Sequence, residues 1–379
     1  MMTGREKIES ALSPQGTPEI GVGLCYTVLL VRDLWKQVTS CPWWYRFSPE
    51  FEQQIAWRRD SINTIGQDWF DLRDGHMMPG RAQFQLEVVN GNVYRVDKTT
   101  GTRTPVPKPA IGGWHQGYAK SNHPERLVDT HAAIDRLLCV SKPVAAANPS
   151  DELTDVSQAL CREFCTTHLP IGYTQSPLSR CYDVWGFEGM MLMIADRPDL
   201  VQHACECYLR ILLPALDSQA HMGVKAVWLE EILTDMINPA AYAELCFPYA
   251  RRIVAHIRSL GMSSIYYYCG DPRGKLEYII RAQPDCIGLE ESKKTFTIDI
   301  EDVVDFVDGR CAVLGNVDAI NLLPKASEQE LAAEIARQVR AGRRNKSRFI
   351  IGIGSPVTPE TPLARVRLFC DLSRRSGTG

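Results

Sequence analysis

The chain has 379 residues, of which 45% are hydrophobic and 23% charged, and its formal net charge is −3. This length suits one α/β barrel with an insertion, and the composition is that of a globular protein whose core needs no disulfides or metals to hold it together. The small net charge gives no electrostatic reason to expect nucleic acid or an anionic membrane as a partner. No stretch reaches eighteen apolar residues, so a membrane-spanning helix is not predicted.

The thirteen cysteines are scattered, and no two of them have the Cys-x-x-Cys spacing. Thiols without a framework are typical of reduced, buried core residues. The first residues, Met1 to Lys7, are polar and mixed in charge, which predicts the start of a short amphipathic helix and not a signal peptide. We therefore expect a cytoplasmic protein.

In the N-terminal part, residues 20–25 are the candidate for a first barrel strand. Residues 84–106 break the pattern that follows, because two β-rich runs flank the pair Asn90-Gly91. An Asn-Gly pair between such runs predicts a hairpin with a type I′ turn. We expect 84–106 to be a small antiparallel insertion into a single domain that spans 1–379. Residues 180–186 are predicted as a further strand.

The C-terminal half predicts five consecutive strand–loop–helix units. Their strands are expected at 223–229, 264–268, 286–289, 311–314 and 349–353. Short apolar runs that alternate with helices are typical of parallel strands covered on both faces. Together with the N-terminal candidates, eight strands can be accommodated. The sequence therefore predicts a (β/α)₈ barrel.

The helices between these strands carry end signals. One helix is predicted from 239 to 260, with apolar residues spaced to bury one face. Asp299 is placed to cap the helix that follows the strand at 286–289, and Gly309 is expected to end that helix. Ser327 and Glu330 form a capping box for a later helix, which Gly342 is expected to end.

Polar or ionisable residues follow five successive predicted strands. They are Glu230 and Glu231, Cys269 and Asp271, Glu290 and Glu291, Asn316 and Asp318, and Ser355. In a (β/α)₈ barrel the reacting groups lie where strands run into the βα loops. Each residue alone has an ordinary explanation, since loops are polar. Their repetition at every strand end is what favours an active site.

Three runs carry a family resemblance. They are Tyr268-Cys269-Gly270, Gly315-Asn316-Val317-Asp318 and the run from Gly354 to Pro362. Their order and spacing are similar to those of the uroporphyrinogen decarboxylase superfamily, over roughly residues 180 to 372. The resemblance implies a barrel enzyme with one of two chemistries, decarboxylation or methyl transfer to or from a corrinoid.

The decarboxylases of this superfamily use an arginine-rich loop after the first strand to hold the carboxylates of a tetrapyrrole. Here Leu24 is followed by a segment in which Arg32 is the first arginine. A substrate with many carboxylates needs several fixed guanidinium groups. The resemblance therefore points to the corrinoid-dependent methyltransferase branch, with decarboxylation of another carboxylate as the alternative and a non-catalytic binding protein as a third hypothesis.

Members of the methyltransferase branch usually bind zinc through His-x-Cys and a later cysteine. This chain has Cys269, but Tyr267 stands at the histidine position and Ser355 at the later cysteine position. Glu291 matches a carboxylate ligand of related zinc enzymes. Cys269 and Glu291 are thus metal-ligand candidates in an incomplete set, and the alternative is that Cys269 is simply a small residue at the rim.

Without zinc, an acidic pocket can activate the methyl donor or acceptor. Closely placed carboxylates raise one another's pKa, and one of them then stays protonated and can act as a general acid. The catalytic candidates are Glu230, Glu231, Cys269 and Asp271, and the substrate-binding candidates are Glu290, Asn316, Asp318 and Ser355. Pairing of some acids with rim arginines such as Arg273 is the alternative. The expected partner is a separate corrinoid protein that carries cobalamin, together with a small methyl donor or acceptor.

Overall fold

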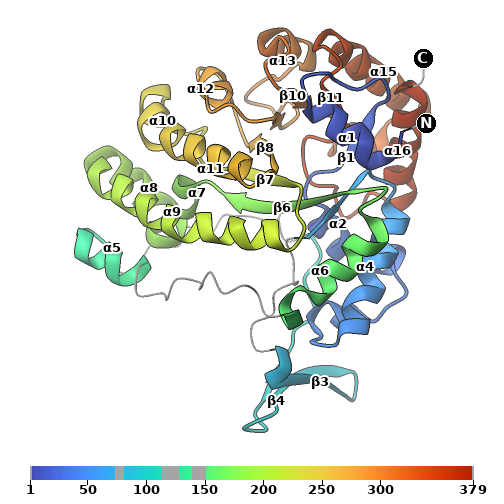
Figure 1. Cartoon of the computed structure of the whole chain (residues 1–379), viewed down its shortest axis with the longest axis vertical. Coiled ribbons are helices and arrows are strands. Elements are labelled where there is room, and N and C mark those ends of the chain that lie inside the picture. Colours follow the sequence, from blue (N-terminus) through green and yellow to red (C-terminus); the bar gives the residue numbers. More distant parts are fainter. Residues whose placement is uncertain (1, 73–80, 113–127, 139–150, 378–379) are drawn as a thin grey trace.

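The computed structural model describes residues 2–72, 81–112, 128–138 and 151–377. Within these ranges, eight parallel strands form a nearly closed barrel surrounded by helices (Figure 1). The barrel strands are β1 (Gly21–Gly23), β2 (Trp69–Asp71), β6 (Leu169–Gln175), β7 (Ala226–Glu231), β8 (Ser263–Tyr268), β9 (Cys286–Leu289), β10 (Ala312–Leu314) and β11 (Phe349–Gly352). This architecture confirms the predicted (β/α)₈ fold.

The strands are hydrogen-bonded in the order β1-β11-β10-β9-β8-β7-β6-β2, so the barrel closes between β1 and β2. The backbone of Asp68 donates a hydrogen bond to the carbonyl of Val22 at 2.8 Å. The Asp68 side chain in turn accepts one from the backbone of Val22 at 2.8 Å, and Gln67 accepts one from Leu24 at 3.1 Å. Two side chains thus replace the ladder bonds that such short strands cannot make.

The helices alternate with the strands around the barrel. They are α1 (Gly4–Leu12), α2 (Thr27–Asp33), α3 (Trp35–Val38), α4 (Phe51–Ile65), α5 (His131–Leu138), α6 (Asp151–Phe164), α7 (Pro177–Arg180), α8 (Tyr182–Asp196), α9 (Pro198–His221), α10 (Pro239–Leu245), α11 (Phe247–Ser259), α12 (Leu276–Arg281), α13 (Ile300–Val307), α14 (Leu322–Lys325), α15 (Glu328–Arg344) and α16 (Leu363–Gly377). Figure 1 shows α1 and α16, and both ends of the chain, on the same side of the barrel. No helix in the described ranges combines the length and the apolarity that a membrane crossing requires.

The predicted hairpin is confirmed as part of a three-stranded antiparallel sheet, with β3 (Phe84–Val89), β4 (Asn92–Asp97) and β5 (Arg103–Pro105). Its turn residues Asn90 and Gly91 have φ values of 50° and 79°. A type I′ turn requires positive φ at both central positions, which Asn and Gly tolerate best. Figure 1 shows this sheet standing away from the barrel, on the side where α4 and α6 lie.

The predicted strand at 180–186 is wrong, because this segment belongs to α7 and α8. Ser176 caps α7 by accepting a hydrogen bond from the backbone of Ser179 at 3.2 Å, and Pro177 occupies the first turn. Cap and proline together start a helix there. The strand of this unit lies earlier, in β6, which the sequence pattern did not reveal.

Two of the predicted helix starts are confirmed, but one predicted helix end is wrong. Ser327 and Glu330 form the expected capping box of α15, and Asp299 caps α13. Gly342 does not end α15, which continues to Arg344. A Cβ at Gly342 would lie 2.2 Å from Cγ of Phe349, so glycine is needed there for the close approach of helix and strand.

The predicted helix at 239–260 is two helices, α10 and α11, which meet at Cys246. Pro248 stands in the first turn of α11. Proline has no N–H and its ring clashes with the carbonyl four residues earlier, so it interrupts a continuous helix.

Candidate active site at the barrel mouth

An aromatic layer fills the barrel below its C-terminal mouth. Trp228 of β7 stacks on Tyr267 of β8 with ring centroids 4.5 Å apart, and Trp69 of β2 contacts Trp228 edge-on at 6.3 Å. Tyr26, at the start of α2, packs edge-on against Tyr267 at 5.7 Å. These large buried rings close the bottom of the mouth, and the polar rim residues lie above them.

The last two residues of β7 are glutamates that face opposite sides of the barrel wall. Successive side chains in a strand alternate between its two faces. Since Trp228 points into the barrel, Glu230 points into the mouth and Glu231 points to the helical layer outside. The acidic cluster predicted from the sequence is therefore divided by the strand itself.

Glu230 is held in the mouth by two donors from β6. The hydroxyl of Tyr173 donates a hydrogen bond to Glu230 Oε2, and Gln175 Nε2 donates another to the same oxygen at 3.1 Å. Glu230 is 5% exposed, and its two partners are half-buried. Neither partner was identified from the sequence, because β6 was not predicted as a strand.

Glu231 is fully buried behind β7. Ser176 Oγ donates to its Oε1 at 2.6 Å, and the hydroxyl of Tyr266 donates to its Oε2 at 2.8 Å. The hydroxyls of Tyr266 and Tyr242 of α10 lie 2.7 Å apart. Burial raises the pKa of Glu231 to about 7, although the donated hydrogen bonds lower it. Contrary to expectation, Glu231 does not share the rim with Glu230.

Cys269 follows β8 and faces Tyr26 across the mouth. The Cys269 Sγ and the Tyr26 hydroxyl lie 3.3 Å apart. Burial raises the pKa of the Cys269 thiol well above its ordinary value, and the nearby carboxylates of Glu230 and Glu290 raise it further. Cys269 is therefore a neutral thiol in an acidic surrounding.

Tyr26 is a mouth residue that the sequence did not single out. Its φ of 52° lies in the left-handed region, which is uncommon for a residue other than glycine. Non-glycine residues in this region cluster at functional sites. The position directly after the first strand was the available signal, since Tyr26 follows Cys25 where β1 enters its loop.

Glu290 is the first residue after β9. It accepts a hydrogen bond from the backbone of Gly270 at 3.1 Å, and its own carbonyl accepts one from Asn316 Nδ2 at 3.0 Å. Burial raises the pKa of Glu290, and the neighbouring ammonium of Lys293 opposes this effect without cancelling it. A carboxyl that keeps its proton to higher pH can act as a general acid.

Lys293 brings a positive charge to the same rim. Its Nζ donates to Glu291 Oε1 at 2.6 Å and to Ser355 Oγ at 2.7 Å, which ties the β9 loop to the β11 loop. Glu291 Oε2 is buried and has no hydrogen-bond partner among the described residues. No sequence pattern pointed to Lys293, because it lies in the loop two residues beyond the strand-end pair Glu290 and Glu291.

The remaining predicted residues lie at the edge of this centre. Asp271 binds Arg273, with Nε and Oδ2 2.7 Å apart, and this arginine lowers the pKa of Asp271. Asp271 is therefore paired with a rim arginine, as the alternative to an acidic pocket predicted. Asp318 accepts hydrogen bonds from the backbones of Ile320 and Asn321 at 2.8 and 2.7 Å, so it orders its own turn.

Asn316 is held between strand and helix by Gln338 of α15, whose Oε1 accepts from the Asn316 backbone at 3.2 Å. A groove of about 580 Å³ runs beside the rim and is lined by Glu291, Asn316 and Asp318 together with Lys325 and other residues. The predicted substrate-binding residues thus divide between the mouth and this groove.

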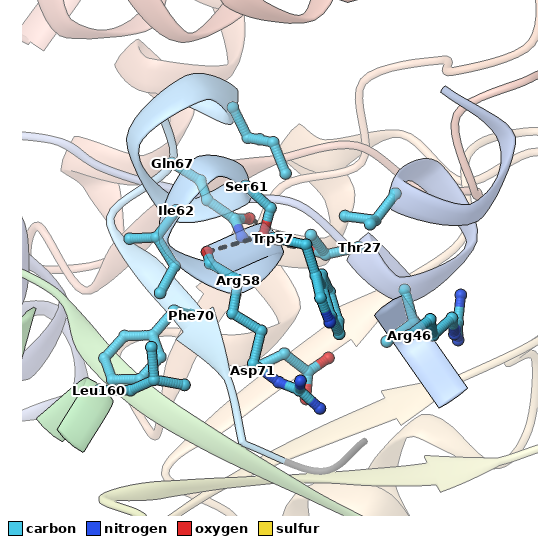
Figure 2. Close-up of a pocket in the computed structure, with 13 residues that line it drawn as sticks. Thr27, Arg46, Trp57, Arg58, Ser61, Ile62, Gln67, Phe70, Asp71 and Leu160 are labelled. Atoms are coloured by element: carbon cyan, nitrogen blue, oxygen red, sulfur yellow. Dashed lines mark hydrogen bonds between the residues drawn. The ribbon is translucent and has the colours of Figure 1, made fainter. Parts of the chain in front are cut away.

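A separate cavity of about 50 Å³ lies against β2, between α2 and α4 (Figure 2). Its lining includes Trp57, Arg58 and Asp71, and the guanidinium of Arg58 lies 4.2 Å from the ring centroid of Trp57. None of the predicted site residues is among those that line it. This cavity is therefore distinct from the mouth.

The uroporphyrinogen decarboxylase (URO-D) family model matches residues 122–376 of the chain. The chain belongs to this family. It is 28% identical over 219 residues to the uroporphyrinogen decarboxylase of Nitrosospira multiformis, a match that covers 54% of this chain and 58% of that protein. It is 24% identical over 260 residues to the uroporphyrinogen decarboxylase of Gloeobacter violaceus, covering 65% of this chain and 72% of that protein.

Among solved structures, a methyltransferase from Methanosarcina mazei superimposes with a TM-score of 0.66, over 99% of both chains, at 14% identity. At that identity the likeness speaks for the fold alone. The family model thus places the chain in the URO-D family, and the structural neighbour supports the barrel fold.

The mouth of this URO-D protein does not fit the zinc site of the methyltransferase branch. A zinc ligand must be a thiolate, a neutral imidazole or a carboxylate. Tyr267, which stands at the histidine position, donates its hydroxyl to the carbonyl of Gly354 at 2.5 Å, and Oε1 of Glu291 is bound by the ammonium of Lys293. In the described ranges, the one group of three His, Cys, Asp or Glu ligand atoms within 4.8 Å of one another includes neither Cys269 nor Glu291.

Among the described residues, no arginine forms a hydrogen bond or ion pair with Glu230, Cys269 or Glu290, whereas a URO-D substrate with many carboxylates would need several such cations. Arg32 forms a two-point ion pair with Asp33, at 2.7 and 3.0 Å. It lines an outer groove with Trp35 and other residues of α2 and α3. Lys293 is the cation that binds Glu291 and Ser355 at this rim.

Proposed function

We propose that the chain is a methyltransferase that moves a methyl group between a small methylated compound, or a folate, and a corrinoid carried by a partner protein. The observation that carries this proposal is the pair of carboxyl groups, Glu230 and Glu290, that flank the neutral thiol of Cys269 at the barrel mouth. URO-D membership and the fold of a known methyltransferase support it.

Proton transfer is the chemistry that this mouth can supply. When the bond between a methyl carbon and its oxygen or nitrogen breaks, the departing heteroatom keeps the electron pair and needs a proton. Glu290, whose pKa is raised by burial, is the donor of that proton, and Glu230 orients the substrate through its second oxygen. In the opposite direction the same carboxylate takes the proton from the acceptor, as microscopic reversibility requires.

The corrinoid supplies the cobalt centre that gives or accepts the methyl group. Its approach from a second protein suits this site, because Tyr26, Tyr173, Cys269 and Glu290 are half-buried and so reach the surface of the mouth. A reacting group that arrives from outside needs such partly exposed partners.

Decarboxylation of a different carboxylate is the second candidate. The sequence relatives are uroporphyrinogen decarboxylases, which favours it, and Lys293 is a cation able to hold a substrate carboxylate. A single ammonium suits a substrate with one or two carboxylates better than one with eight.

The test is to mix the purified protein with methylcobalamin, and separately with cob(I)alamin, against thiols, folate and methylated ethers and amines while the corrin absorbance is followed. Methyl transfer is expected with at least one partner, and it should fall strongly in Glu230→Gln. Glu277→Gln is the matched control, since Glu277 pairs with Arg310 on the surface at 3.0 Å.

Unchanged corrin spectra with every partner would contradict the proposal. Release of carbon dioxide from a carboxylate in the absence of cobalt, lost in Lys293→Met, would then establish the second candidate.

A further inference from the structure

A group of metal-ligating side chains lies in the outer helical layer, where α5 packs against α9 (Figure 1). It comprises Asp135 of α5 with His203 and Cys207 of α9. Their ligand atoms all lie within 4.8 Å of one another. The proposed function uses none of these residues.

The distances inside the group are short. His203 Nε2 lies 2.8 Å from Asp135 Oδ1 and 3.8 Å from Cys207 Sγ, and that sulfur lies 3.6 Å from the same carboxylate oxygen. Cys207 is buried, whereas the side chains of His203 and Asp135 are 23% and 48% exposed. The group is therefore backed by the core and reachable from solvent.

The spacing in the sequence makes this arrangement stable. His203 and Cys207 are four residues apart on α9, so they share one helix face. Asp135 follows His131 by the same interval on α5, and the His131 ring centroid lies 4.6 Å from that of His203. His131 thus stands beside the group, although its ligand atoms are not among those that lie within 4.8 Å of one another.

We propose that Asp135, His203 and Cys207 bind a divalent metal of the zinc class. Tetrahedral zinc bonds of about 2.0–2.3 Å place neighbouring ligand atoms about 3.3–3.6 Å apart. The two distances to sulfur already approach this value, and the His203–Asp135 pair needs to open by about 0.5 Å. Water or a rotated His131 completes the fourth position.

Binding exchanges protons for the metal. The cation replaces the proton shared between His203 Nε2 and Asp135 Oδ1, and the thiol of Cys207 releases its proton to become a thiolate. Affinity therefore increases with pH. A site with one sulfur, one nitrogen and one oxygen prefers zinc, cobalt or cadmium to magnesium or calcium, which favour oxygen ligands alone.

The chain contains a matched pair without the thiol. His256 Nε2 of α11 lies 2.8 Å from Asp217 Oδ1 of α9, the same distance as in His203–Asp135. If an exposed His–Asp pair were enough to hold the metal, both pairs would bind it. We expect only the His203–Asp135 pair to bind the metal, because only this pair has a buried sulfur, that of Cys207, beside it.

The experiment is a titration of the metal-stripped full chain with cobalt(II), followed by absorbance and by thermal unfolding. A thiolate ligand produces a sulfur-to-cobalt charge-transfer band. We expect one equivalent to give this band and to raise the melting temperature. Cys207→Ser should abolish the band, and His203→Gln should weaken binding at least tenfold. His256→Gln should leave the titration as in the wild type, and zinc should displace the cobalt.

Circular dichroism in the presence of a chelator shows whether each variant is folded, and Cys205→Ser, one half-turn away in the same helix, serves as a thiol control. Absence of any band in the wild type, or a band of full intensity that survives both Cys207→Ser and His203→Gln, would overturn the proposal. Because the readout is coordination, it is independent of methyl transfer.

Discussion

The barrel mouth and the layer of helices behind β7 give two adjacent glutamates opposite surroundings. Glu230, on the inner face, meets Tyr173 and Gln175 in a half-buried mouth. Glu231, on the outer face, meets Ser176 and Tyr266 and is fully buried. A carboxylate at a strand end can therefore join the mouth only if its strand turns it toward the inside of the barrel.

The largest effect is expected from Glu290→Gln in the mouth. Loss of the acidic proton should lower methyl transfer by about 10²–10⁴-fold, the usual contribution of a general acid. In the wild type, the proton is present below the raised pKa of Glu290, so activity in the direction that needs it should fall as the pH rises through that pKa.

The measurement is the rate against pH for the wild type and the variant, with unfolding curves as the control. A variant with the wild-type rate and pH profile would remove Glu290 from the chemistry.

Behind β7, Glu231→Gln should change stability and not chemistry. Burial raises the pKa of Glu231 from 4.5 to about 7, so the folded state holds a proton that the unfolded state has lost. The free energy of unfolding should therefore decrease as the pH rises from 4.5 to 7 and then level off, by about 3 kcal/mol in all.

Urea unfolding at several pH values tests this prediction. The glutamine variant should lack this part of the pH dependence and be the more stable protein at pH 8, whereas Glu230→Gln should keep it. Parallel curves for the wild type and Glu231→Gln would contradict the assignment.

Lys293→Met should lower both activity and stability, because Lys293 lies at the mouth and neutralises a buried carboxylate. It leaves Glu291, whose side chain is 5% exposed, without its cation. We expect a loss of about 2 kcal/mol in the free energy of unfolding, less than for a fully buried pair since Lys293 itself is 27% exposed.

The double variant Lys293→Met with Glu291→Gln should regain most of that stability, as measured by urea unfolding. No recovery would mean that the bond from Lys293 to Ser355, and not the ion pair, is what stabilises the rim.

The smallest effect is expected from Gly342→Ala in the outer layer. Glycine to alanine normally stabilises a helix interior by about 1 kcal/mol. Here the new Cβ would clash with the Phe349 ring, so we expect a net loss of about 1–2 kcal/mol with unchanged activity. Thermal unfolding measures it, and Phe349→Leu in the same chain should relieve part of the loss. A more stable alanine variant would show that the helix and strand can move apart.

Much of the C-terminal half was predictable, and the N-terminal half was not, for a physical reason. Strand β8 ends in Ile265 and three tyrosines, and β9 is a short apolar run followed by a loop and by α13, which Asp299 caps. By contrast β1 and β2 have three residues each, and β6 contains Pro170 and Gly172, which are poor strand formers. Their strand form depends on pairing with neighbours that are distant in sequence.

The candidate site followed the same division. Strand-end positions identified Glu230, Cys269 and Glu290, because the residues where a buried strand stops are readable in the chain. Tyr26 and Lys293 lie in loops, where no periodicity points to them. The separation of Glu231 from Glu230 depended on which face of β7 lies inside the barrel. The sequence does not show this, because it does not show that Trp228 points inward.

By itself, the sequence determined the barrel, the hairpin and the set of polar residues at strand ends, because apolar periodicity, turn chemistry and helix caps act between residues close in the chain. Only the tertiary structure decided which of those residues meet. It brought the Tyr26 hydroxyl into contact with the Cys269 thiol and the Lys293 ammonium into contact with Glu291 and Ser355. It also brought Asp135 beside His203 and Cys207. The reason is that such contacts join segments far apart in sequence, and their side-chain directions are set by the closure of the barrel and the packing of its helices.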